Sequence, residues 1–467
     1  MAEPRQFDVA IIGSGPGGYV AAIRAAQLGL KTALVEKDAA LGGTCLHVGC
    51  IPTKALLHSA DILDAAREGP KFGVLTGKVE LDLAAVHKYR TDVVRRQARG
   101  VEYLMKKNNV TVIQGHGRLR GPGRVEVKPA SGAAETVAAK NVILATGSAA
   151  RLLPGLEADG RRVITSTEAL SLQAVPKSML ILGAGAVGVE FASIYSRFGS
   201  KVTLVEMLPR VLPIEDEEVS AEMHKALKRR GIEVRVGSKV ESVKVLDKEV
   251  EIQAQSQKGV ETLKGEVLLV AVGRRPLTGD VGLDTTKAQL DRGYVKVDAR
   301  MQTSEPDLYA IGDILPTPML AHLASHEGLV AAEAIAGKNP RPIDYDHVPN
   351  ATYSDPEVAS VGLTEAAARA RGHKVKTGQF PFPPLGKGRI LGAQEGFVKI
   401  VADERYDELL GVHIIGPKAT ELIGEATLGL TLETTVEEIE HAIHAHPTLS
   451  EAMGEAALAL HGRGIHL

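Results

Sequence analysis

The sequence predicts an α/β protein in which two similar units precede a C-terminal α+β region. The first unit runs from an apolar strand at residues 7–12 through a glycine-rich turn at 13–18 into a helical pattern and a second strand. The same order returns at residue 179, with its glycine-rich turn at 183–188. From residue 349 onward, strand-like and helical segments alternate without that turn, which is typical of α+β packing.

Each copy of the repeat carries three glycines and one acidic residue at matching positions. The acidic residue follows the first glycine by 23 positions in both copies, since 36 minus 13 equals 206 minus 183. The glycines allow a tight turn, a close approach of backbone amides to a pyrophosphate, and close packing of the helix on the strand. The helix N-terminus stabilises the phosphate charge, and the acidic residue accepts hydrogen bonds from ribose hydroxyls. A glycine-rich turn that binds nothing is the alternative for either copy alone. Together the copies predict two Rossmann-like domains that each bind a dinucleotide, through Gly13, Gly15, Gly18 and Glu36 in the first and Gly183, Gly185, Gly188 and Glu206 in the second.

The residues around Glu206 indicate which nicotinamide dinucleotide the second unit binds. Met207 and Leu208 follow Glu206, and no arginine occurs before Arg210. An acidic residue without a neighbouring arginine favours a free ribose 2′-hydroxyl over a 2′-phosphate. The sequence therefore predicts NAD rather than NADP.

Three further strand ends are candidates for the first site. Residues 141–148 and 268–276 are apolar strands that end in small-residue turns, although each has a purely structural interpretation as a buried strand and its turn. Residues 307–313 end a strand with Asp313, whose carboxylate is placed to accept a bond from a ribityl hydroxyl of FAD. A turn or capping aspartate is the alternative.

The only two cysteines of the chain, Cys45 and Cys50, lie five positions apart. Two cysteines do not make a disulfide scaffold for a chain of 467 residues. A structural zinc site needs four ligands, and recruiting His47 and His58 makes a weak case, so we predict no metal. A helical pattern opened by Pro52 places Cys50 at a helix N-terminus, where the macrodipole favours the reactive thiolate. We predict a redox dithiol; two unrelated core cysteines are the alternative.

Composition limits the class of protein. A length of 467 residues is compatible with about three domains, and 44% hydrophobic residues suit a globular protein with a large core. The net charge of -2 gives no electrostatic footprint for nucleic acid. The N-terminal residues show no basic-then-apolar leader, and no run of about 18 apolar residues occurs, so we expect a soluble cytoplasmic protein without membrane insertion.

The order of these features resembles the flavin disulfide reductases over almost the whole chain. Residues 45–52, Cys-Leu-His-Val-Gly-Cys-Ile-Pro, and residues 446–451, His-Pro-Thr-Leu-Ser-Glu, are most similar to the dihydrolipoamide dehydrogenase branch of that family. His47 stands where the family usually has Asn. Residues 354–357, Ser-Asp-Pro-Glu, vary a usual Thr-His-Pro-Glu, and we expect neither change to alter the chemistry.

The resemblance implies four regions: an FAD domain at 1–148, an NAD domain at 149–273, a central segment at 274–346 that completes the FAD domain, and an interface domain at 347–467. It also implies a homodimer in which the interface domain carries its histidine into the partner's active site. Its expected partners are the lipoyl domains and the dihydrolipoyl acyltransferase of a 2-oxo acid dehydrogenase complex, or a glycine cleavage system.

The resemblance implies a role for each residue of the redox centre. His446, oriented by Glu451, would deprotonate dihydrolipoamide, and the substrate sulfur would attack Cys45. Cys50 would lie against the flavin and pass two electrons through FAD to NAD. From the residues alone, Pro447 opens a helical pattern at 447–460 and His446 would cap it. Neighbouring His444 is the other candidate base.

Further cofactor contacts are also implied by the resemblance. Lys54, four residues after Cys50, would lie at the flavin and pair with Glu190 of the second repeat. The remaining contacts expected for FAD are Gly117, Thr146, Gly147, Asp313 and Ala321, and those for NAD are Val240 and Gly273.

Other functions remain open on the sequence. A glutathione reductase usually has a basic cluster for NADP, and a mercuric reductase has a C-terminal cysteine pair that this chain lacks. A dinucleotide-binding scaffold or sensor without turnover would not need the His446 to Glu451 stretch. A cysteine-ligated metal protein would purify with metal instead of flavin.

Overall fold

The computed structural model describes residues 5–467, which form two compact units. The first unit contains the chain up to Ala55 together with Ala85–Arg151 and Arg274–Ile343. The second contains Leu56–Ala84, Leu152–Gly273 and Asp344–Leu467. The division into four regions stays a prediction.

The first unit is built on a seven-stranded sheet in the order β3-β2-β1-β6-β5-β4, with β19 also paired to β6. β1 is parallel to β2 and β6, and Ile12 at its end is in register with Val35 and Leu144. The carboxyl ends of three strands therefore meet at one edge, just before the first glycine-rich turn. The strands are β1 (Arg5–Ile12), β2 (Thr32–Glu36), β3 (Thr111–Gln114), β4 (His116–Leu119), β5 (Arg124–Lys128), β6 (Glu135–Leu144) and β19 (Leu308–Ala310).

Smaller elements complete this unit. They are α1 (Pro16–Gln27), α2 (Gly43–Val48), α8 (Ala321–Ile335), the short strands β7 (Ser148–Ala150), β16 (Arg274–Pro276), β17 (Leu290–Asp291) and β18 (Tyr294–Val295), and the 3-10 turns η2 (Leu283–Thr285) and η3 (Gly312–Ile314). Helices α3 (Cys50–Glu68) and α4 (Leu83–Lys107) each contribute residues to both units.

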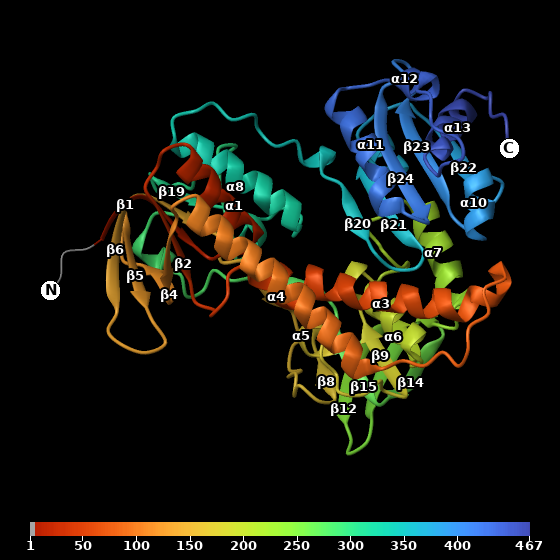
Figure 1. Cartoon of the computed structure of the whole chain (residues 1–467), viewed down its shortest axis with the longest axis horizontal. Coiled ribbons are helices and arrows are strands. Elements are labelled where there is room, and N and C mark those ends of the chain that lie inside the picture. Colours follow the sequence, from red (N-terminus) through yellow and green to blue (C-terminus); the bar gives the residue numbers. More distant parts are fainter. Residues whose placement is uncertain (1–4) are drawn as a thin grey trace. The chain divides into compact units, whose positions relative to one another are not determined.

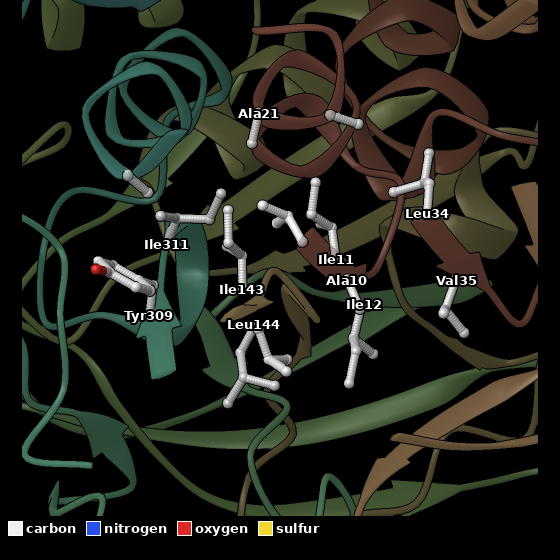
Figure 2. Packing of buried hydrophobic residues seen from close by; sticks show 14 of the residues in the cluster. Ala10, Ile11, Ile12, Ala21, Leu34, Val35, Ile143, Leu144, Tyr309 and Ile311 are labelled. Atoms are coloured by element: carbon white, nitrogen blue, oxygen red, sulfur yellow. The ribbon is translucent and has the colours of Figure 1, made fainter. Parts of the chain in front are cut away.

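The core of the first unit follows the alternation of side chains along its strands. Helices α1 and α8 lie side by side over one face of the sheet (Figure 1). Figure 2 shows Ile11 and Ile143 directed toward these helices, whereas Ile12 and Leu144 point to the opposite face. All four are buried, so both faces of these strands are covered.

The N-terminal part of the second unit repeats the parallel arrangement. Its sheet has the order β11-β10-β9-β15-β8, with an antiparallel three-stranded sheet β12-β13-β14 beside it. The elements are η1 (Gly69–Phe72), β8 (Val163–Ile164), α5 (Ser166–Ala169), β9 (Ser178–Leu182), α6 (Ala186–Phe198), β10 (Lys201–Val205), α7 (Glu217–Arg229), β11 (Glu233–Arg235), β12 (Lys239–Val245), β13 (Val250–Ser256), β14 (Gly259–Gly265) and β15 (Val267–Val270).

The C-terminal part of the second unit is an antiparallel sheet in the order β20-β21-β24-β23-β22. Helix α11 packs on β21 and β24, and α13 packs on β22 and β23. The elements are η4 (Tyr345–His347), β20 (Asn350–Thr352), β21 (Glu357–Gly362), α9 (Glu365–Ala370), β22 (Val375–Pro381), α10 (Gly386–Leu391), β23 (Phe397–Asp403), β24 (Leu409–Gly416), α11 (Ala419–Thr431), α12 (Val436–His441) and α13 (Glu451–Leu460).

One predicted helix boundary is wrong. The helix expected to start at Pro447 begins at Glu451. The N–H of Thr448 donates to the carboxylate of Glu451, and its hydroxyl donates to the carbonyl of Ala445, so residues 447–450 form a turn. His446 therefore does not cap the helix.

Within residues 5–467, no helix is both long enough and apolar enough to cross a membrane.

Candidate active site

The first glycine-rich turn, residues 13–18, has no room for side chains at three of its glycines, Gly13, Gly17 and Gly18. Gly13 has a φ of +106°, and a Cβ there would lie 2.3 Å from the carbonyl oxygen of Ala145. A Cβ at Gly18 would lie 1.9 Å from the carbonyl oxygen of Gly13. At Gly15 a Cβ would meet nothing within 4 Å, so this position faces open space. The turn thus packs tightly on its strand and is open where a pyrophosphate would approach the backbone.

The second glycine-rich turn, residues 183–188, repeats this geometry. A Cβ at Gly183 would lie 2.4 Å from the carbonyl oxygen of Ala271, and one at Gly188 would lie 1.9 Å from that of Gly183. Gly185 again has nothing within 4 Å. Both turns fit the predicted dinucleotides.

The two acidic residues of the repeat accept the same kind of hydrogen bonds from backbone N–H groups. Oε2 of Glu36 accepts the N–H of Ser14 at 2.8 Å, and Oε1 accepts the N–H of Asp38 at 2.9 Å. Oε2 of Glu206 accepts the N–H of Ala184 at 2.7 Å, and Oε1 accepts that of Leu208 at 2.8 Å. Both carboxylates are buried, fixed, and retain lone pairs for ribose hydroxyls.

The two cysteines lie close to the first turn. Cys45 is on α2, Cys50 is the first residue of α3, and a Cβ at Gly43 would lie 2.7 Å from Cα of Gly15. The hydrogen bond between the two sulfurs, with burial, raises the pKa of the Cys45 thiol. In the dithiol form this shift favours the protonated thiol at Cys45.

Asp313 belongs to a small polar cluster in the first unit. It lies in η3, accepts a hydrogen bond from the hydroxyl of Ser148, and has Nε of Arg274 at 3.8 Å. Arg274 also donates to Oγ of Ser148 at 2.6 Å. Nearby, Thr146 donates to the carbonyl of Leu277 at 2.7 Å, and Gly147 has a φ of +72°.

The remaining residues predicted for FAD lie in the same unit. Gly117 on β4 is buried, and a Cβ there would lie 3.0 Å from Val35. Ala321 is the first residue of α8, and Lys54 is half-buried on α3, one turn after Cys50. These assignments stay predictions.

The residues predicted for NAD lie in the second unit. Glu190 is buried in α6, and its Oε1 accepts the N–H of Tyr353 at 2.9 Å. Gly273, with a φ of +109°, follows β15, and Val240 is half-buried on β12. The pairing of Glu190 with Lys54 stays a prediction.

His446 and Glu451 are hydrogen-bonded to each other. Nδ1 of His446 lies 2.9 Å from Oε1 of Glu451, and the His446 side chain is 76% exposed. Burial raises the pKa of Glu451, but the Thr448 N–H and His446 outweigh burial and lower it. When Nδ1 of a histidine donates a hydrogen bond to an ionised carboxylate, Nε2 is the ring nitrogen that can accept a proton.

Sequence reasoning missed several partners of these residues. The predicted turns and strand ends contain Ser14, Ser148 and Arg274. Only the fold shows that Ser14 contacts Glu36 and that the other two residues contact Asp313. His444 was considered as a base, and its partner Glu425 was missed. Glu425 and His444 are 19 positions apart, and no local sequence pattern predicts a contact over that separation.

Among residues 5–467, no cluster of three or more histidine, cysteine, aspartate or glutamate side chains is arranged to hold a metal ion.

Comparison with known proteins places these features in one family. The model of the pyridine nucleotide-disulphide oxidoreductases matches residues 7–328, and that of the dimerisation domain of the same family matches residues 348–457. A dihydrolipoyl dehydrogenase of Bacillus subtilis is 48% identical, with 99% of each chain covered. One of Chlorobaculum tepidum is 47% identical, covering 97% of this chain and 96% of the relative. The crystal structure of LpdA from Mycobacterium tuberculosis superimposes with a TM-score of 0.90 at 27% identity, covering 97% of this chain and 99% of that one.

These matches confirm the predicted fold class, two Rossmann-like domains with a C-terminal α+β dimerisation domain. They also confirm the prediction of an oxidoreductase that uses FAD and NAD, and the resemblance stated from residues 45–52 and 446–451. The chain belongs to the pyridine nucleotide-disulphide oxidoreductase family, in the branch of the dihydrolipoyl dehydrogenases.

Proposed function

We propose that this protein oxidises a dihydrolipoyl group, carried on a lipoyl domain, and reduces NAD⁺ to NADH. The observation that carries the proposal is the cysteine pair beside the first glycine-rich turn, in a chain 48% identical to a dihydrolipoyl dehydrogenase. The acyltransferase of a 2-oxo acid dehydrogenase complex, or a glycine cleavage system, would present the lipoyl domain. The cytoplasmic location stays a prediction.

The thiol half of the reaction uses residues of this chain. With Cys45 and Cys50 joined as a disulfide, a substrate thiolate attacks Sγ of Cys45, and Cys50 leaves as a thiolate. The second substrate thiol then attacks the substrate sulfur bound to Cys45, which closes the lipoyl disulfide, and its proton passes to Cys45 as that sulfur leaves. The substrate loses two electrons and two protons, and the cysteine pair gains the electrons. His446 accepts a proton from the attacking thiol, and Glu451 stabilises the imidazolium.

FAD, when bound, supplies the route by which the two electrons reach NAD⁺ as a hydride. The first glycine-rich turn with Glu36 and Asp313 would hold FAD, and the second turn with Glu206 would hold NAD. The place of Cys50 at the start of α3 supports Cys50 as the cysteine nearer the flavin, since a helix N-terminus favours a charged sulfur.

A homodimer would bring the two halves of the site together. The exposed large apolar side chains of the C-terminal domain include Leu428, Leu432 and Ile443, which are 60%, 68% and 100% exposed. Exposed apolar side chains of this size are often found at protein interfaces. The predicted base His446 is exposed on the same domain, in keeping with a base that acts on the cysteines of the partner.

The test combines spectroscopy with complementation between subunits. The purified protein should show a flavin spectrum that NADH bleaches, and it should form NADH from dihydrolipoamide. Cys45→Ser and His446→Ala homodimers should each be nearly inactive, and co-refolded mixtures should regain activity, since a heterodimer has one intact pair of Cys45 and His446. Metal without flavin, or NADPH-dependent reduction of glutathione disulfide, would overturn the proposed function. If the mixed subunits regain no activity, the active site is not shared between subunits, and the proposed reaction still stands.

A further inference from the structure

His444 lies next to the predicted base and has a carboxylate partner of its own. Its Nε2 lies 2.8 Å from Oε1 of Glu425 on α11. The hydrogen bond with Glu425 raises the pKa of His444, which favours the positively charged ring. Its side chain is only 11% exposed, so this cation is largely removed from water.

The ring of His444 also lies against α13, the helix that begins with Glu451. A Cβ at Gly454 would come within 3.3 Å of Nδ1 of His444. Gly454 follows Glu451 by three positions, so the two residues lie on one face of the helix. The absence of a side chain at Gly454 lets the His444 cation approach the turn that carries Glu451.

The electrostatics agree with this geometry. Two carboxylates act on His444, Glu425 from α11 and Glu451 from α13, and His446 is the other titratable group on the same loop. The hydrogen bond with Glu425 is the main cause that raises the pKa of His444, and the charge of Glu451 adds to it. In turn, the charge of His444 helps to lower the pKa of Glu451.

We propose that His444, held by Glu425, is a positioning residue that shares the charge of Glu451 with His446. Without the His444 cation, the whole field of the Glu451 carboxylate would act on His446 and hold its proton more tightly. The cation offsets part of that field, which leaves Nε2 of His446 available to accept the substrate proton. This inference rests on the proposed role of His446 as the thiol base.

The test is the pH dependence of dihydrolipoamide oxidation in His444→Gln and Glu425→Gln. His444→Gln removes the cation, and Glu425→Gln keeps an acceptor but removes the charge that holds the ring protonated. In both variants the ascending limb of the pH–rate profile should move upward by about half to one pH unit, an effect typical of one lost charge a few ångströms away. The rate on that limb should fall about threefold to tenfold, while the maximum at high pH is retained. Reduction of an artificial acceptor by NADH should not change.

His466→Gln is the matched control. His466 pairs with a carboxylate of α13, since its Nδ1 lies 2.6 Å from Oε1 of Glu455. The pH–rate profile of His466→Gln should superimpose on that of the wild type. A uniform loss of rate at every pH in both test variants, or unshifted profiles, would overturn the inference. If His444→Gln loses FAD or dissociates, the Glu425→Gln profile decides. A wild type without dihydrolipoamide activity would instead overturn the proposed function.

Discussion

Oε1 of Glu451 lies 2.9 Å from Nδ1 of His446, and the other carboxylate oxygen accepts the N–H of Thr448 at 2.8 Å. With both oxygens engaged, the carboxylate cannot turn away from the ring. Because Nδ1–H donates to Glu451, Nε2 is the basic nitrogen and faces away from the carboxylate. The pair is therefore ready to accept a proton without rearrangement.

His446→Ala should separate two activities of the enzyme. Proton transfer by a positioned histidine contributes about a hundred- to ten-thousand-fold in rate, so dihydrolipoamide oxidation should fall by a factor of that order. Reduction of an artificial acceptor by NADH needs no base at the disulfide and should survive. Steady-state assays of both reactions on dimeric, FAD-loaded protein decide the matter. A parallel loss of both activities would mean that His446 is not the thiol base.

Cys45→Ser and Cys50→Ser should differ in their spectra. Both should lose lipoamide turnover, because exchange needs two sulfurs. On two-electron reduction, Cys45→Ser should keep the long-wavelength absorbance of a thiolate against the flavin, and Cys50→Ser should lose it while retaining FAD. Persistence of that band in Cys50→Ser would show that the roles of the two sulfurs are reversed.

Glu206 should determine the preference for NAD over NADP. Replacing its carboxylate by an amide and adding a cation, as in Glu206→Gln with Met207→Arg, removes repulsion against a 2′-phosphate. The ratio of kcat/KM for NAD to that for NADP should fall by about tenfold or more. Glu36→Gln is the matched change in the first repeat and should weaken FAD retention without altering this ratio. Equal use of NAD and NADP by the wild type would contradict the assignment.

Lys399 should be essential for the stability of the second unit. Its side chain is 3% exposed, and its Nζ lies 3.0 Å from Asp216, 2.9 Å from Glu218 and 2.9 Å from Glu365. Lys399→Met leaves the buried carboxylate of Asp216 without its cation and should destabilise the unit by about 3–5 kcal/mol. Lys264→Met is the control, since Lys264 also pairs with two carboxylates but is 51% exposed, and it should cost less than about 1 kcal/mol. Equal losses in thermal denaturation would contradict the role of burial.

Asp216 should make the fold sensitive to acid. Burial raises the pKa of Asp216, but the fields of His413 and Lys399 and the hydrogen bond from Lys399 outweigh burial and lower it. A lowered carboxyl pKa stabilises the fold above the ordinary value of about 3.9, and this contribution is lost as the pH falls through the lowered value. Below about pH 4, the melting temperature of the wild type should therefore fall more steeply than that of Asp216→Asn. Parallel curves over this pH range would contradict the prediction.

The features predicted correctly from the sequence are those fixed by local sterics. Gly13 and Gly183 need positive φ angles, and Gly18 and Gly188 need to lie against a carbonyl, so their spacing alone reveals the turn. The start of α3 near Pro52 was predicted for the same reason, since proline suits a first helical turn.

The features that were missed depend on contacts between distant residues. α13 begins at Glu451 because that side chain binds the Thr448 N–H. The spacing of apolar residues, from which the helix was predicted, contains no information about this hydrogen bond. β19 joins the first sheet by pairing with β6. Asp313 accepts a hydrogen bond from Ser148, which lies 165 residues earlier in the sequence. Such pairings exist only after the chain has folded.

The two glycine-rich turns also bear on how the enzyme tells its two cofactors apart. Each offers the same tight backbone, the same open position at Gly15 or Gly185, and a carboxylate fixed by two backbone N–H groups. In the proposed function these parts would bind an adenosine ribose and a pyrophosphate, which FAD and NAD share. The turns are therefore interchangeable modules that cannot discriminate a flavin from a nicotinamide. Selectivity has to arise where the two molecules differ, and exchanging one turn for the other should leave each cofactor in its own domain.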